Sequence, residues 1–68
     1  MKYTLLDKLQ DDDGIWRLEQ LYDTRDISWR IVFADDAGDH DFERYYTKKS
    51  ATKAFADLRQ GFELSHTP

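Results

Sequence analysis

The sequence contains no cysteine among its 68 residues. Disulfide bonds and thiolate metal sites are therefore excluded, and the fold must be stabilised by side-chain packing, by a hard-metal site or by self-association. A chain of this length forms one domain and buries only about 60% of the surface that its unfolded form exposes. The two tryptophans, four tyrosines and four phenylalanines offset this small size, because each contributes a large apolar area to a core.

Long apolar runs and a surplus of basic residues are also missing. The uncharged run Ile31 to Ala34 is far shorter than the roughly 18 apolar residues that a membrane span requires. The start of the chain, Met1 to Asp7, carries charge before an apolar region forms, so we expect no secretory signal and a cytoplasmic location. Ten basic residues against fourteen acidic ones give a net charge of -4, which disfavours general binding to phosphate backbones.

Three polar clusters divide the first two thirds of the chain into four short segments. These clusters are Asp11 to Gly14, Asp23 to Asp26 and Asp35 to Asp41, all rich in turn-forming residues. Between them, Ile15 to Tyr22 and Ser28 to Phe33 are dense in β-branched and aromatic residues, which suit a pleated surface. Both segments are predicted to be strands.

The alternation within these two strands places their bulky apolar side chains on one face of a sheet. This inner face consists of Trp16, Leu18, Tyr22, Trp29, Ile31 and Phe33. We expect Trp29 to lie opposite Tyr22, a register in which the two apolar faces coincide, because a slip of one residue would turn the whole set to solvent. Trp16 and Trp29 are therefore predicted to be core residues and not a pair that stacks on a ligand.

Residues 2–10 leave two interpretations open. Tyr3, Leu5 and Leu9 alternate as they would in a strand, whereas Thr4 is a suitable cap for a short helical turn. We favour a strand, because a helix of about six residues before the turn would be shorter than most.

The fourth segment, Asp41 to Tyr46, is also predicted to be a strand, with Phe42 and Tyr46 on the inner face. The opposite face of the sheet is expected to remain uncovered. Its members are Ile15, Leu21, Val32, Arg17, Glu19, Arg30 and Arg44. Such a mixture suits either a solvated face with cross-strand ion pairs or a modest contact surface.

From Ser50 the apolar period changes from that of a strand to that of a helix. The apolar stripe consists of Ala51, Ala54, Phe55, Leu58 and Phe62. Ser50 is expected to cap the first turn and Gly61 to end the helix. The predicted fold is an α+β domain over residues 1–64, a four-stranded antiparallel meander with one C-terminal helix packed on one face, followed by a frayed tail at 65–68.

Half of the acidic residues sit in two loops that a meander brings to the same end of the molecule. They are Asp11, Asp12, Asp13, Asp35, Asp36, Asp39 and Asp41. Like charges gathered in this way are either well solvated or await a cation or a basic partner. The spacing lacks the bidentate glutamate of a twelve-residue calcium loop, so we predict neither a metal site nor a cofactor.

Catalytic residues are not predicted. His40 lies between two aspartates, but the chain has no cysteine and no serine in a Gly-rich elbow to accompany it as a general base. A basic and aromatic stretch forms the alternative site, for single-stranded nucleic acid, and it consists of Arg44, Tyr45, Lys48, Lys49 and Lys53.

The sequence therefore favours a small accessory or regulatory protein without enzymatic activity. We expect it to act through its acidic end on a protein with a basic surface, and the open sheet face suits a homodimer. Weak binding of single-stranded nucleic acid is the alternative function.

Overall fold

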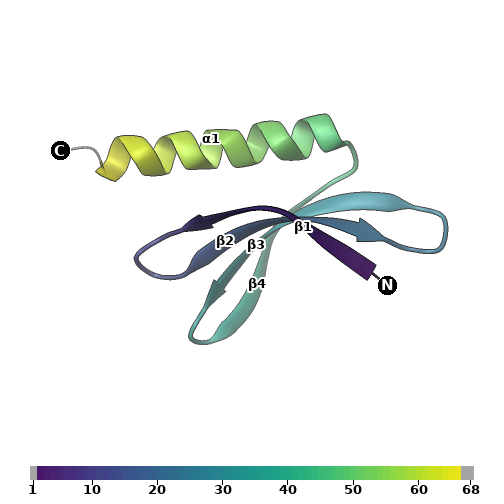
Figure 1. Ribbon diagram of the computed structural model, residues 1–68, viewed down its shortest axis with the longest axis horizontal. Coiled ribbons are helices and arrows are strands. Elements are labelled where there is room, and N and C mark those ends of the chain that lie inside the picture. The colour runs from purple at the N-terminus through teal and green to yellow at the C-terminus, as the bar shows by residue number, and fades with distance from the viewer. Residues whose placement is uncertain (1, 67–68) are drawn as a thin grey trace.

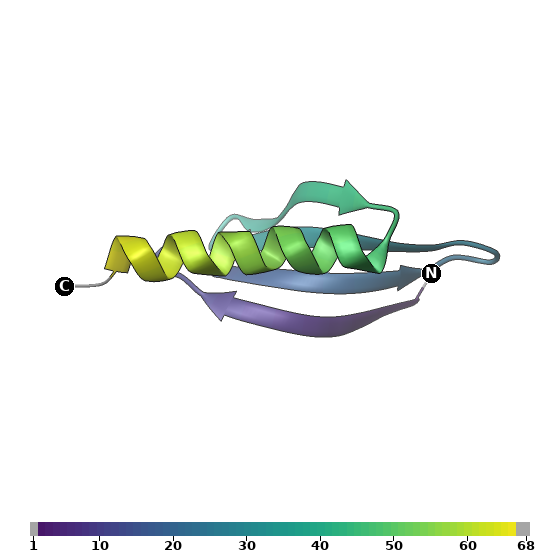
Figure 2. The same cartoon turned by 90° about the horizontal axis from the view of Figure 1, so that it is seen from above.

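The computed structural model describes residues 2–66, with side chains up to Glu63. The chain forms β1 (Lys2–Gln10), β2 (Ile15–Tyr22), β3 (Ile27–Asp35) and β4 (Gly38–Tyr45), followed by α1 (Lys48–His66). The strands build one antiparallel sheet in the order β1-β2-β3-β4, and α1 lies across one face of it (Figure 1 and Figure 2). The predicted ββββα fold and the assignment of residues 2–10 to a strand are confirmed.

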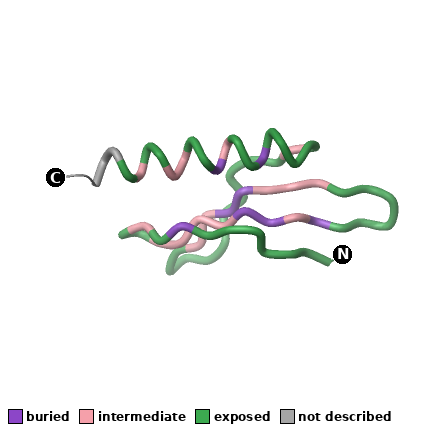
Figure 3. Tube along the Cα trace, turned by 45° about the horizontal axis from the view of Figure 1, so that its top comes forward, coloured by how far each residue is buried: buried purple, intermediate pink, exposed green. Residues whose placement is uncertain are grey.

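The core lies between α1 and the helix-facing side of the sheet. Its buried cluster consists of Leu9, Leu18, Ile31, Ala51 and Phe55. Trp16 and Trp29 pack against this cluster, so the alternation pattern identifies the inner face correctly. Figure 3 shows how unevenly burial is distributed, because the two outer strands β1 and β4 are exposed along almost their whole length.

The register of β2 and β3 differs from the expected one by two residues. Trp29 lies opposite Gln20 and not opposite Tyr22, so that prediction is wrong. The strands continue further because a tight turn joins them: the amide of Asp23 donates to the carbonyl of Asp26 at 2.9 Å, and the amide of Asp26 returns a bond at 3.2 Å. A shift of two residues leaves every side chain on its face, which is why the inner face is still right.

The inner face of β4 is also different. Tyr46 is 77% exposed and follows the strand, whereas Tyr45 lies opposite Trp29 and packs against the core. The reason is a β-bulge: the register shifts between Ile31 and Val32, and this shift exchanges the faces of the residues beyond it. Phe42 is 59% exposed, although its ring meets that of Trp16 edge-on at 5.2 Å.

Both predicted ends of the helix are wrong. Thr47 is the cap, because its hydroxyl oxygen accepts a hydrogen bond from the amide of Ser50 at 3.2 Å. At the other end α1 continues through Gly61 to His66, because only a helical path keeps Phe62 on the stripe that packs against the core. The helix thus enters the segment assigned to a frayed tail, of which residues 67–68 lie outside the described part.

The surroundings of Gly14 and Gly61 predict opposite effects of a substitution by alanine. A Cβ on Gly14 would collide with the backbone carbonyl oxygen of Ala34, whereas a Cβ on Gly61 meets nothing within 4 Å. We expect Gly14→Ala to lower the free energy of unfolding by about 1–3 kcal/mol, and Gly61→Ala to raise it by up to about 1 kcal/mol. Urea titrations of both variants measure this, and an equal response at the two sites would contradict the close approach.

Candidate functional site

The two acidic loops lie at the same end of the molecule. The loop between β1 and β2 and the turn between β3 and β4 both point away from the β2–β3 turn (Figure 1). They are neighbours because Ile15, which follows the first loop, pairs with Ala34 just before the second. The C-terminal half of α1 reaches the same end, where Asp11 and Asp57 line one shallow groove.

Two of the loop carboxylates hold their own loops in shape. Asp11 accepts a hydrogen bond from the indole nitrogen of Trp16 at 3.3 Å, and another from the amide of Asp12. Asp35 accepts one from the amide of Ala37 at 2.8 Å and lies 3.1 Å from Nε2 of His40. The bond from Ala37, followed by that from His40, lowers the pKa of Asp35 below its usual value.

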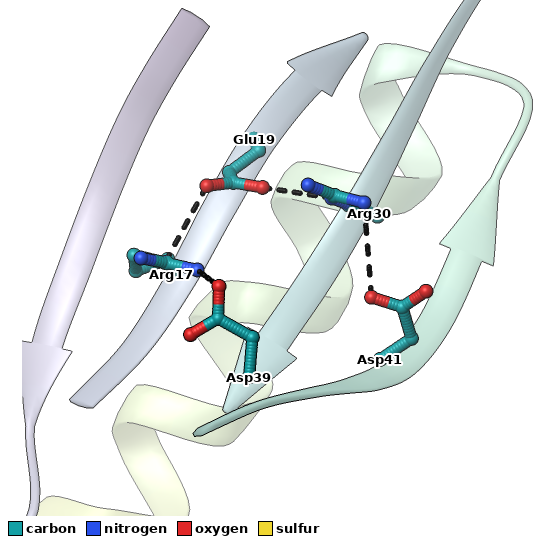
Figure 4. A network of polar contacts seen from close by, with 5 residues as sticks. All are labelled: Arg17, Glu19, Arg30, Asp39 and Asp41. Carbon is teal, nitrogen blue, oxygen red and sulfur yellow. Dashed lines mark hydrogen bonds and ion pairs between the residues drawn. The ribbon is translucent and has the colours of Figure 1, made fainter. Parts of the chain in front are cut away.

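Two further loop carboxylates belong to a line of charges across the sheet face opposite α1, which we call the charged stripe. It consists of Asp39, Arg17, Glu19, Arg30 and Asp41 (Figure 4). Arg17 Nη2 lies 2.7 Å from Oδ2 of Asp39, and Arg30 Nη1 lies 3.8 Å from Oδ1 of Asp41. Both arginines also face Glu19, at 3.4 Å from Arg17 Nε and at 2.7 Å from Arg30 Nε.

Glu19 is the one charged residue with a side chain that is almost fully buried among the described residues, at 1% exposure. No second layer of described residues covers this face, so the burial comes from neighbours on the same face, and both flanking arginine side chains are themselves about three quarters buried. The hydrogen bond to Asp39 raises the pKa of Arg17 further above its usual value, which keeps the guanidinium charged. Glu19 is thus compensated by two permanent cations.

The acidic residues predicted from the sequence therefore fall into three groups. Asp39 and Asp41 face arginines, and Asp11 and Asp35 fix their loops, as described above. The carboxylates that remain at the exposed tips belong to Asp12, Asp13 and Asp36. The seven aspartates together with Arg17, Arg30 and Glu19 carry a net charge of -6; because the whole chain carries -4, all other residues sum to +2.

The alternative site is divided between two surfaces and the core. Arg44 lies opposite Arg30 on the face away from α1, whereas Lys48, Lys49 and Lys53 belong to α1 itself. Tyr45 packs against the core, where burial and the nearby charge of Glu43 raise its pKa. These residues do not form one continuous surface.

Among the side chains that the structure describes, up to Glu63, no group of three or more histidines, aspartates or glutamates is arranged to hold a metal ion. Nor does this part of the chain contain a helix with the length and apolar character needed to cross a membrane. Comparisons with models of protein families, with curated proteins and with solved structures give no match.

The charged stripe predicts unequal effects of two conservative substitutions. Glu19→Gln leaves two guanidinium groups without their buried partner, so we expect the free energy of unfolding to fall by about 3 kcal/mol. Asp41→Asn alters an exposed carboxylate at 3.8 Å from its arginine and is expected to cost less than about 1 kcal/mol. Chemical denaturation of both variants measures the difference, and a similar small loss in each would refute the importance of Glu19.

The raised pKa of Tyr45 predicts a loss of stability in alkali. In the unfolded chain this tyrosine ionises near its ordinary pKa of 10.0, whereas the folded protein holds the proton to higher pH. Its contribution to stability is thus complete below about pH 10 and is lost as the pH rises through the folded-state pKa. Melting temperatures between about pH 9 and pH 11.5 should fall less steeply in Tyr45→Phe than in the wild type. Tyr46→Phe, which removes the hydroxyl of a tyrosine that is 77% exposed, is the matched control for the substitution itself.

Proposed function

We propose that this protein works by contact and not by catalysis, and that its acidic end binds a basic surface on a protein partner. The observation that carries the proposal is the separation of charge, with -6 over the acidic loops together with the charged stripe and +2 over all other residues. A field of this kind steers a partner of opposite charge into one orientation and suppresses association with acidic surfaces.

Local order at the acidic end supports a binding role. The amide of Asp11 donates to the carbonyl of Gly14 at 2.8 Å, and Asp35 anchors the β3–β4 turn through Ala37. Loops fixed in this way lose little conformational freedom when a partner binds, so more of the interaction energy is retained as affinity.

The exposed tips identify the aspartates expected to contribute most. Asp13 and Asp36 project from the two loops, whereas Asp39 and Asp41 already face arginines. A basic partner that approaches the paired carboxylates must compete with Arg17 and Arg30. We therefore place the centre of the contact at the tips, with the charged stripe at its margin.

Catalysis by His40 has less support, because its ring and Asp35 are paired at 3.1 Å on an open hairpin that offers no desolvated cleft. Binding of single-stranded nucleic acid is the weaker alternative, because its residues are divided between two surfaces.

We expect capture of the partner to be sensitive to charge at the tips and to salt. Immobilised wild-type protein should retain a basic protein from a native lysate at about 0.05 M salt and release it at about 0.5 M. Asp13→Asn combined with Asp36→Asn should lower the retained amount several-fold, because two unpaired negative charges are removed. Quantitative mass spectrometry of the eluates measures this.

The matched control changes the same number of charges at the opposite end. Asp23→Asn combined with Asp26→Asn keeps a side-chain oxygen at both positions of the β2–β3 turn. Such an oxygen is needed at residue 23, where the carboxylate accepts a hydrogen bond from the amide of Thr24. Capture by this variant should equal that of the wild type. A protein retained equally by both double variants, or retained at high salt, would show that the acidic end is not the binding surface.

A further inference from the structure

The outer edge of β1 is the most apolar free edge of the sheet. Among the described strands only β2 pairs with β1, so the backbone groups on its other side have no strand partner. Three apolar residues near its start are exposed: Tyr3 is 61% exposed, Leu5 48% and Leu6 37%. Exposed apolar residues beside an unpaired strand edge favour pairing with a further strand.

The opposite edge of the sheet is protected in the way that natural sheets usually are. β4 carries Asp39, Asp41, Glu43 and Arg44 within eight residues, and a bulge interrupts its pairing with β3. A second strand placed there would set carboxylates against carboxylates. This contrast makes β1 the edge at which association is favoured.

The sequence of β1 is compatible with antiparallel pairing to itself. A two-fold axis perpendicular to the sheet keeps both helices on one side and requires residues of the same face to oppose each other. With the axis at Thr4, Tyr3 of each copy lies opposite Leu5 of the other copy. Thr4 lies opposite the Thr4 of the second copy, so the pairs over residues 3–5 contain no charged side chain.

The bulge of β1 limits this pairing to the first half of the strand. The register with β2 shifts between Leu5 and Asp7, so the regular stretch is Lys2 to Leu5. Beyond it, Asp7 is turned to α1, where Arg59 Nη2 lies 2.9 Å from its carboxylate. Its charge is therefore held by the helix of the same chain and does not oppose the second copy.

We propose that two copies of this chain associate through β1 into a continuous eight-stranded sheet, with Thr4 at the two-fold axis. The Tyr3 and Leu5 side chains of both copies form an apolar seam on the face away from the helices. On the helix side, a groove of about 450 Å³ lies between α1 and the β1 edge, lined in part by Leu6, Leu18 and Phe55. The second copy closes the open side of this groove.

The open sheet face is less suited to the second copy. Its centre is the charged stripe, and stacking two such faces would remove Arg17 and Arg30 of both copies from water without supplying new carboxylates. Edge pairing leaves that stripe exposed to solvent and adds main-chain hydrogen bonds.

A single cysteine tests the register directly, because the chain has none of its own. Residues that face each other in an antiparallel pair have Cα atoms about 4.5–5.5 Å apart, within the range of a disulfide. Thr4→Cys should therefore form a disulfide-linked dimer under mild oxidation, whereas Thr24→Cys, in the exposed β2–β3 turn, should not. A monomeric Thr4→Cys, or equal cross-linking of the two variants, would overturn the proposed register.

Sedimentation analysis over a range of concentrations tests the association itself. The wild type should approach twice the chain mass of 8.1 kDa. Tyr3→Lys combined with Leu5→Lys removes the seam and should weaken dimerisation at least about tenfold. Ile27→Lys combined with Tyr46→Lys removes two other exposed apolar residues and should leave it unchanged. Circular dichroism confirms that each variant is folded.

Two results would overturn the proposal. One is a wild type that stays at 8.1 kDa at all concentrations, which would leave the edge to a segment of another protein. The other is a dimer that resists the Tyr3 and Leu5 substitutions, which would place the contact elsewhere. Neither result bears on the acidic end, because that surface is tested by capture at the opposite end of β1.

Discussion

One helix covers one face of the sheet. The rest of the structure depends on how the apolar residues of the other face are kept from water without a covering layer. Leu21 and Val32 are 3% and 1% exposed on that uncovered side, as buried as the residues beneath α1. Arg17 lies directly opposite Val32, and Arg30 directly opposite Glu19. The long aliphatic parts of arginine side chains can cover apolar neighbours while their charged ends reach carboxylates. The charged stripe thus replaces a missing layer.

This arrangement explains why charged side chains occupy the centre of the uncovered face, where apolar side chains would pack more simply. Replacing a buried ion pair by well-packed apolar groups is often neutral or stabilising. On a face without a cover, however, apolar replacements for Arg17, Glu19 and Arg30 would create a large exposed patch of the kind that promotes association. The stripe covers the buried apolar residues of this face with polar groups. It also pairs Asp39 and Asp41, which belong to the acidic cluster, with arginines and so reduces the concentration of negative charge there.

Properties that depend on alternation could be predicted from the sequence, whereas those that depend on a single inserted residue or a distant contact could not. The faces of Trp16 and Trp29 follow from a period of two, and a register error of two residues leaves them unchanged. The bulge in β4 inserts one residue without a sequence signal and reverses the assignment of Tyr45 and Tyr46. The helix continues past Gly61 because packing of Phe62 outweighs the weak preference of glycine for a helix end.

The candidate site shows the same division. Clustering of the acidic loops at one end follows from the meander alone, but the partners of each carboxylate depend on register and could not be predicted. To predict the burial of Glu19, one would have to know that Arg30 lies opposite it while Arg17 lies two residues before it. Its one local signal was an Arg-x-Glu pair on a strand face, which also fits an ordinary solvated ion pair.

The edge and the acidic end are compatible because of the direction of β1. This strand begins at Lys2, near the apolar edge residues, and runs toward the acidic loop that follows Gln10. A two-fold axis at Thr4 reverses the direction of the second copy, so the two acidic ends point away from each other. Association through the acidic ends would instead bring two clusters of negative charge together, at a cost in repulsion. Pairing through β1 therefore leaves both negatively charged ends exposed, and a dimer built in this way presents two separate surfaces to basic partners.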